Sequence, residues 1–120
     1  MLTLPSYTKL SGTDVNELHA NLWKGEVAPE EFAGRMVSAL EQEPVFLAKY
    51  DFTSDAGEPR RISTTFILRD EAGGQMIDVR VDEEHTGLVL TRVFKADTFA
   101  ERFPKWFGDG MAWFLALAWQ

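Results

Sequence analysis

The C-terminal end of this chain is its most apolar segment, and it constrains the fold because it cannot be left in water. Between Met111 and Trp119 the only polar side-chain groups are the indole N–H groups of two tryptophans. Fully burying one large apolar side chain is worth about 1.5–3 kcal/mol, so the six in this run represent roughly 10 kcal/mol. That value is comparable to the whole stability of a small domain. The segment is therefore expected to be the last element of a core or half of an interface.

Two secondary structures fit this terminal run. Its alanine, leucine and methionine residues favour a helix, whereas every second residue from Trp113 to Trp119 is large and apolar, as in a buried strand. Of the two, we expect a helix. Just upstream, Thr98 and Glu101 have the spacing of a capping box and predict the start of a short helix, which Pro104 should interrupt.

The N-terminal third predicts two helices. The first should begin near Thr13 or Asp14, and Gly25 stands where a C-terminal glycine belongs. Pro29 suits the first turn of the second helix. Each helix has an apolar stripe at helical spacing, formed by Val15, Leu18 and Leu22 in the first and by Phe32, Met36 and Leu40 in the second. Because only a few residues separate them, the two helices should form an antiparallel αα-hairpin.

From Pro44 onward the period of the apolar residues changes from near 3.6 to 2. Four runs within residues 45–53, 62–68, 77–81 and 88–94 are separated by short polar turns. The cleanest alternation places Ile77, Val79 and Val81 on one face, with Asp78 and Arg80 on the other. Four consecutive strands with short turns predict an antiparallel meander. The fold class is therefore α+β, a single domain over residues 1–120, with the αα-hairpin and the C-terminal helical segments on one sheet face.

Composition excludes several classes of function. Twelve basic residues stand against nineteen acidic ones, a formal net charge of −7. Nucleic-acid binders need a basic footprint, so this charge argues against them and favours a partner with a basic surface. The chain has no cysteine, which suits a reducing compartment. The first five residues lack the features of a signal peptide, and the nine-residue apolar run is about half of a membrane span. We expect a cytoplasmic protein that does not bind membranes.

No motif in the sequence predicts catalysis, a metal or a cofactor. Glu83, Glu84 and His85 are adjacent, but metal ligands converge from separate elements, and a solvated turn has the same composition. His19 lies at the margin of an apolar helix stripe, where a histidine is usually structural. We therefore expect no catalytic, metal or cofactor-binding residue and no bound cofactor.

The hypothesis that remains is binding of another protein. Eight aromatic residues follow position 93, and Trp106 and Phe107, between Pro104 and a Gly-Asp-Gly sequence, are the ones we expect at the surface. Acidic turns at 54–59 and 82–87 should meet at one end of the sheet, with 70–74 at the other. The predicted partner-binding residues are Asp55, Glu58, Asp82, Glu83, Glu84, Trp106 and Phe107.

Three roles fit such a protein. The first is a non-enzymatic, inhibitor- or immunity-type module that neutralises a partner protein, with acidic turns steering association. The second is a dimeric secretion-type chaperone that binds an extended peptide along its sheet. The third is an enzyme or small-ligand carrier with a pocket between sheet and helices. The sequence leaves monomer and homodimer open.

Overall fold

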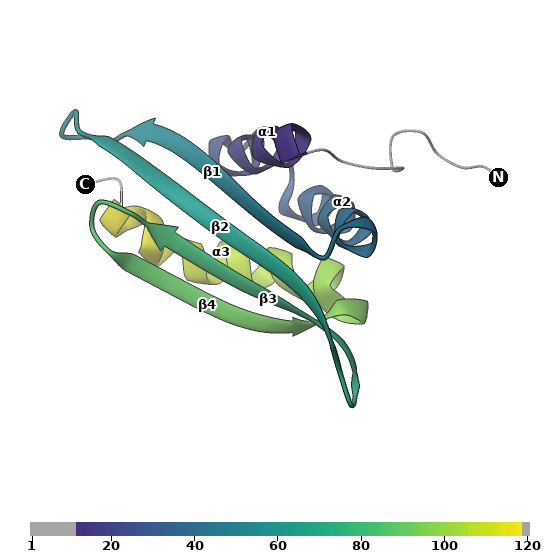
Figure 1. The fold of residues 1–120 in the computed structure, drawn as a ribbon. Helices are drawn as coiled ribbons and strands as arrows, with labels where there is room; N and C mark the ends of the chain where they lie inside the picture. Colours follow the sequence, from purple (N-terminus) through teal and green to yellow (C-terminus); the bar gives the residue numbers. More distant parts are fainter. Residues whose placement is uncertain (1–11, 119–120) are drawn as a thin grey trace.

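The computed structural model describes the backbone of residues 12–118 and the side chains of residues 14–110. It is an α+β fold, as predicted (Figure 1). The elements, in chain order, are α1 (Gly12–Lys24), α2 (Pro29–Gln42), β1 (Val45–Thr53), β2 (Pro59–Glu71), β3 (Gly74–Glu83), β4 (Leu88–Lys95), the 3₁₀ turn η2 (Ala96–Thr98) and α3 (Phe99–Ala118).

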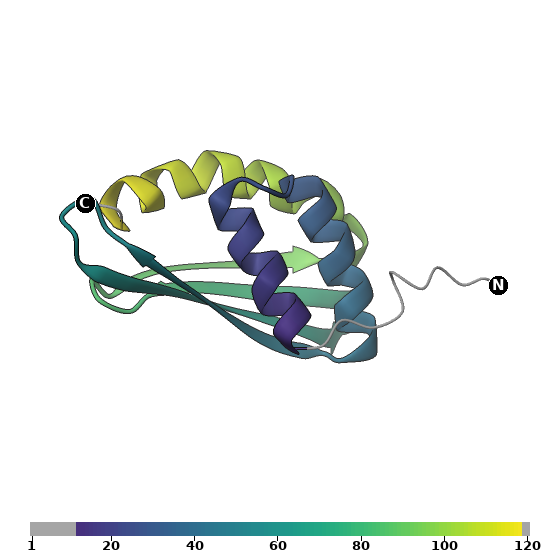
Figure 2. The same cartoon turned by 90° about the horizontal axis from the view of Figure 1, so that it is seen from above.

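The four strands form one sheet in the order β1-β2-β3-β4, and every neighbouring pair is antiparallel. This confirms the predicted meander. All three helices lie on the same side of the sheet (Figure 2). The helices therefore cover one face only. We call the other face the helix-free face. In β1, β2 and β4 it is formed by the odd-numbered residues, beginning in β2 at Arg61. In β3 it is formed by the even-numbered residues, beginning at Met76.

The predicted helix signals act as expected at the N-terminal end. Val15, Leu18 and Leu22 are buried and form the inner stripe of α1. Gly25 follows the helix with φ +76°, a left-handed conformation that glycine adopts without steric cost. Pro29 then occupies the first turn of α2. The short link makes the two helices run antiparallel above the sheet (Figure 2).

An aromatic cluster joins the layers of the fold. Phe32 on α2 lies 5.8 Å from Phe66 on β2 and 5.5 Å from Phe103 on α3, measured between ring centroids. Phe94 on β4 meets Phe99 edge-on at 5.2 Å. All five rings are at most 3% exposed. Burial of this size fixes the helices over the inner face of the sheet.

The C-terminal helix corrects one prediction. Pro104 does not interrupt it, and Gly108-Asp109-Gly110 is not a turn: α3 is continuous from Phe99 to Ala118. A proline near the start of a helix removes one backbone hydrogen bond. Phe99, Phe103 and Phe107 recur every fourth residue and all pack against the core, and this burial outweighs that loss.

The ends of α3 bear on two further predictions. Thr98 does not act as the capping residue, because it lies in η2 and its hydroxyl donates to the carbonyl of Lys95 at 3.4 Å. The predicted helical conformation of the terminal run is confirmed from Met111 to Ala118. Trp119 and the burial of that run lie outside the described residues. Within residues 12–118, no helix combines the length and hydropathy needed to cross a bilayer.

Candidate functional site

The two turns expected at one end of the sheet do meet there. The β1–β2 turn and the β3–β4 turn approach each other where the Glu58 carboxylate lies 3.9 Å from Nε2 of His85. Asp55, Glu58 and Glu84 are exposed, and Asp51 at the end of β1 is exposed beside them. We call these four residues the acidic end. Three of the predicted partner-binding acids therefore lie in an accessible group.

Glu83 corrects the prediction, because it is 1% exposed and cannot meet a partner. Its carboxylate accepts hydrogen bonds from the backbone N–H groups of His85 and Thr86, at 2.9 and 2.8 Å, and from the Thr86 hydroxyl at 2.7 Å. Burial alone raises the pKa of Glu83, but these hydrogen bonds outweigh it and hold the pKa below its usual value. Glu83 is a structural residue of the turn.

The sequence carried a signal for the burial of Glu83. It continues the inward parity of Ile77, Val79 and Val81 and lies opposite Ile62 in the register of β2 and β3. Arg60, itself buried, lies 3.9 Å from the Glu83 carboxylate. Asp82 has the opposite parity, and it lies on the helix-free face within 3.0 Å of Arg80.

The predicted aromatic anchors lie on the other side of the sheet from Asp82. Phe107 is half-buried, 5.2 Å from the ring of Trp23 and 5.7 Å from that of Phe103. Trp106 is half-buried against Phe94 at 5.6 Å. Both belong to the helix layer of the fold, because they are interior residues of α3. The predicted aromatic and acidic partner-binding residues are therefore divided between the helix layer and the turns at the acidic end.

His19 is a core residue. It is 1% exposed, its Nε2 lies 2.7 Å from the Thr64 hydroxyl, and the indole N–H of Trp23 donates to the same nitrogen at 3.0 Å. Burial lowers the pKa of His19 to about 3, so the imidazole is neutral near pH 7. A neutral, enclosed imidazole that already accepts from an internal donor fits the structural role expected for it.

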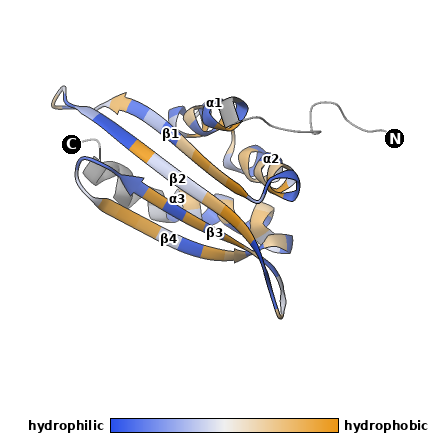
Figure 3. Cartoon of the chain, in the orientation of Figure 1, coloured by the Kyte–Doolittle hydropathy of each residue, from blue (hydrophilic) through white to orange (hydrophobic). Residues whose placement is uncertain are grey.

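The helix-free face has an unexpected apolar component. Val45 and Leu47 on β1 are 53% and 52% exposed, and Val89 and Val93 on β4 are 44% and 48% exposed. These are the exposed large apolar residues among the side chains that the structure describes, and all four occupy outward positions. Figure 3 shows hydrophobic colour at the start of β1 and along much of β4. The sequence contained a sign of this exposure: the four residues stand at odd-numbered positions, whereas the buried Phe46 and Phe94 of the same strands stand at even-numbered ones.

Between these apolar margins, the centre of the helix-free face is charged but internally paired. Arg69 binds Asp78 at 2.8 Å and Arg80 binds Asp82 at 3.0 Å, and at the acidic end Arg61 binds Asp51 at 2.6 Å. The hydrogen bond from the Arg61 guanidinium lowers the pKa of the Asp51 carboxyl. Paired in this way, the central residues give the face little net charge of its own.

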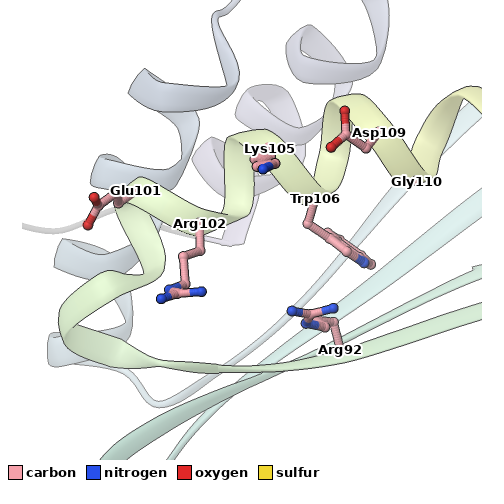
Figure 4. A pocket seen from close by; sticks show the side chains of 7 residues that line it. All are labelled: Arg92, Glu101, Arg102, Lys105, Trp106, Asp109 and Gly110. Atoms are coloured by element: carbon pink, nitrogen blue, oxygen red, sulfur yellow. The ribbon is translucent and has the colours of Figure 1, made fainter.

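A second candidate site is the groove between α3 and β4, which encloses about 600 Å³. Figure 4 shows the side chains that surround it. We call it the α3–β4 groove; it is lined by Arg92, Glu101, Arg102, Lys105, Trp106, Asp109 and Gly110. Sequence reasoning picked out Trp106 but not Arg92, because only the fold brings β4 beside α3.

Comparison with known proteins returns no match for this chain, whether to a protein-family model, to a curated protein or to a solved structure. Within the described part of the chain, no three histidine, aspartate or glutamate side chains gather in a way that could hold a metal ion. Function is therefore inferred from the surfaces that the fold creates.

Proposed function

We propose that this chain is a non-enzymatic, inhibitor-type binding domain, and that its partner protein docks on the helix-free face and the adjoining acidic end. The observation that carries this proposal is that Val45 and Leu47 at one edge of the sheet, and Val89 and Val93 at the other, are all exposed on the one sheet face without helices. Exposed apolar residues scattered singly are ordinary on a protein surface, whereas their concentration on the one uncovered sheet face favours an interaction surface there.

The arrangement of this face suits a protein partner. Apolar side chains supply buried area when a partner excludes water from them, at about 25 cal/mol per Å². The central ion pairs, such as Arg69 with Asp78, are already satisfied within the chain, so docking leaves no charge without its partner. The twisted sheet also offers a rigid surface that changes little on binding.

Charge indicates the chemistry of the partner. Asp51, Asp55, Glu58 and Glu84 border the helix-free face at one end, with Arg61 as their exposed basic neighbour. A partner that covers the apolar margins would therefore place its own lysines or arginines over this end. Such complementarity speeds diffusional encounter more than it slows dissociation.

Two buried titratable groups support a binding role over a catalytic one. His19 accepts from Trp23, and Glu83 accepts from the turn that it stabilises, so both are engaged inside the fold. A general acid or base must reach the proton that it transfers, and neither side chain is accessible to a substrate.

The test is capture of a partner from the native host with matched baits. Leu47→Asp places a charge on the helix-free face, and Ala100→Asp places the same charge on the exposed surface of α3, on the helix side of the fold, as the control. We expect a stoichiometric partner, carrying basic residues at its contact, to be retained by the wild-type chain and by Ala100→Asp and to be lost by Leu47→Asp. Retention by all three baits overturns the docking surface, and recovery of a second copy of this chain alone replaces it with self-association.

Binding kinetics then test the role of the acidic end. Neutralising Asp55, Glu58 and Glu84 together should slow association and flatten its salt dependence, while the dissociation rate stays within about twofold. If dissociation changes and association does not, the acidic end contacts the partner directly and does not steer it.

A further inference from the structure

The α3–β4 groove brings three basic side chains together on a chain that is acidic as a whole. Arg92 reaches it from β4, and Arg102 and Lys105 reach it from α3. Figure 4 shows the guanidinium groups of Arg92 and Arg102 and the indole of Trp106 converging on the space between the helix and the strand. Two like charges turned toward one space repel each other, and an anion placed between them would remove that cost.

The distribution of ion pairs among the arginines also points to the α3–β4 groove. Among the side chains that the structure describes, five arginines lie within 4.0 Å of a carboxylate, namely Arg35, Arg60, Arg61, Arg69 and Arg80. The two remaining arginines of the chain, Arg92 and Arg102, have no such ion pair within the described residues, and both line the groove. The groove therefore presents guanidinium donors that are not committed to carboxylates of the chain.

Contacts with buried aromatic rings position Arg92 and Trp106 in the groove. The Arg92 guanidinium lies 5.7 Å from the centre of the Phe94 ring, within cation–π range. Trp106 packs edge-on against the same ring, at 5.6 Å and 79°, and also contacts Phe103 at 5.8 Å. Because Phe94 and Phe103 are buried, the indole is fixed as one wall of the groove and is available to a planar group of a ligand.

The acidic residues of the groove limit the size of the anion. Glu101 and Asp109 also line it, and Figure 4 shows the Glu101 carboxylate turned away from the two guanidinium groups. With three basic and two acidic side chains the groove has a small positive charge, which suits one compact anionic group and disfavours a polyanion such as nucleic acid. A volume of about 600 Å³ lies within the range of small-ligand pockets.

We propose that the α3–β4 groove binds a small phosphomonoester attached to a planar ring, of the size of a nucleoside monophosphate. Arg92 and Arg102 hold the phosphate, since the planar guanidinium fork matches its oxygens in a bidentate manner. Lys105 adds a third cationic donor, and the ring lies against Trp106. A phosphate is favoured over a carboxylate because its three terminal oxygens can engage three donors at once.

This site is independent of the proposed protein interface, because it lies on the helix side of the fold. Leu47→Asp on the helix-free face should therefore leave ligand binding unchanged, which separates a failure of one proposal from a failure of the other. Gly110 offers an occluding variant of the groove. A Cβ added there would lie 3.8 Å from the Trp106 indole nitrogen, so a leucine at this helical position would extend over the indole.

The experiment is calorimetric titration of the purified chain with AMP, and with adenosine, inorganic phosphate and benzoate as partial probes. We expect AMP to bind most tightly, and Arg92→Gln or Arg102→Gln to weaken it at least about tenfold, as the loss of a charge-assisted hydrogen bond implies. Arg35→Gln, which removes an equal charge from α2, is the matched control and should bind AMP as the wild type does.

A second variant keeps the proposal testable if an arginine variant unfolds. Gly110→Leu changes no charge, favours the helix and should abolish AMP binding by filling the groove. Retained AMP binding in Gly110→Leu, equal loss in Arg35→Gln, or adenosine binding as tightly as AMP overturns the site. Tighter binding of benzoate than of AMP overturns the choice of phosphate.

Discussion

The two faces of the same sheet are built on opposite principles. On the covered face, Phe46, Phe66 and Val79 are at most 6% exposed and pack against the helices. On the helix-free face, the neighbouring residues of the same strands form ion pairs in the centre and leave apolar side chains at the margins. Because strand residues alternate between faces, one set of strands supplies both a core and an exposed surface that is partly apolar. The covered face sets stability, and the helix-free face is available for function.

The largest effect on stability is expected from a charge placed on the covered face. Val79→Asp buries an unpaired carboxylate and should destabilise the fold by about 4 kcal/mol. Its neighbour Asp78, paired with Arg69 on the helix-free face, is the matched control. Because that ion pair is about one-third exposed, Asp78→Asn should change the free energy of unfolding by less than about 1 kcal/mol. Urea unfolding measures both, and a tolerated Val79→Asp with a damaging Asp78→Asn would contradict the assignment of the two faces.

The burial of His19, which packs from α1 against Thr64 on the covered face, predicts how stability depends on pH. The pKa of His19 is lowered to about 3 in the fold from 6.5, so protons bind preferentially to the unfolded chain below pH 6.5. The contribution of the neutral His19 to stability is therefore present above that pH and is lost as the pH drops toward 3. Between pH 7 and pH 5 the loss should be about 2 kcal/mol.

Unfolding in urea at a series of pH values measures this dependence, and His19→Gln should remove the part that lies between pH 7 and pH 5. The control is His85→Gln, which removes an exposed imidazole from the β3–β4 turn in place of the buried one. Carboxyl groups with lowered pKa values, such as Asp51 and Glu83, lose their contribution only at lower pH. A curve for His19→Gln that coincides with the wild-type curve would falsify the account of His19.

A smaller effect is expected where the two faces end, at the β3–β4 turn. Glu83→Gln removes the charge that strengthens the hydrogen bonds from Thr86 and His85, and should destabilise the fold by about 1–2 kcal/mol. Asp55→Asn, on the exposed turn beside it, should change stability by less than about 0.5 kcal/mol. Thermal unfolding of the two variants distinguishes a structural carboxylate from a surface one, and equal effects would show that Glu83 contributes no more than its exposed neighbour.

The smallest effect on stability is expected from the apolar margin of the helix-free face. Leu47→Ser should change the free energy of unfolding by less than about 0.5 kcal/mol, because the side chain is already half exposed. The same substitution should weaken partner binding if this face is the interface. A Leu47→Ser variant that unfolds readily would show that the margin contributes to the core and would remove the contrast between the two faces.

Prediction from sequence succeeded where the local pattern of residues is itself the physical cause of the structure. The alternation from Ile77 to Val81 fixes which side of the strand is buried, and Gly25 and Pro29 mark helix ends through their own backbone preferences. It failed at Pro104, where a local rule predicted a break and distant aromatic packing outweighed it. It failed again at Glu83, whose acidic side chain suggested solvent although its parity indicated the interior.

The sequence alone therefore determined the α+β class, the order of the elements and the inward face of the sheet, because those follow from the spacing of residues close together in the chain. The tertiary structure decided which surfaces exist. Arg92 and Arg102 become neighbours only when β4 packs under α3, and Val45 and Val93 share a face only through the register of four strands. Both candidate sites combine residues from separate elements, and such proximity depends on the packing of the whole chain rather than on any local pattern.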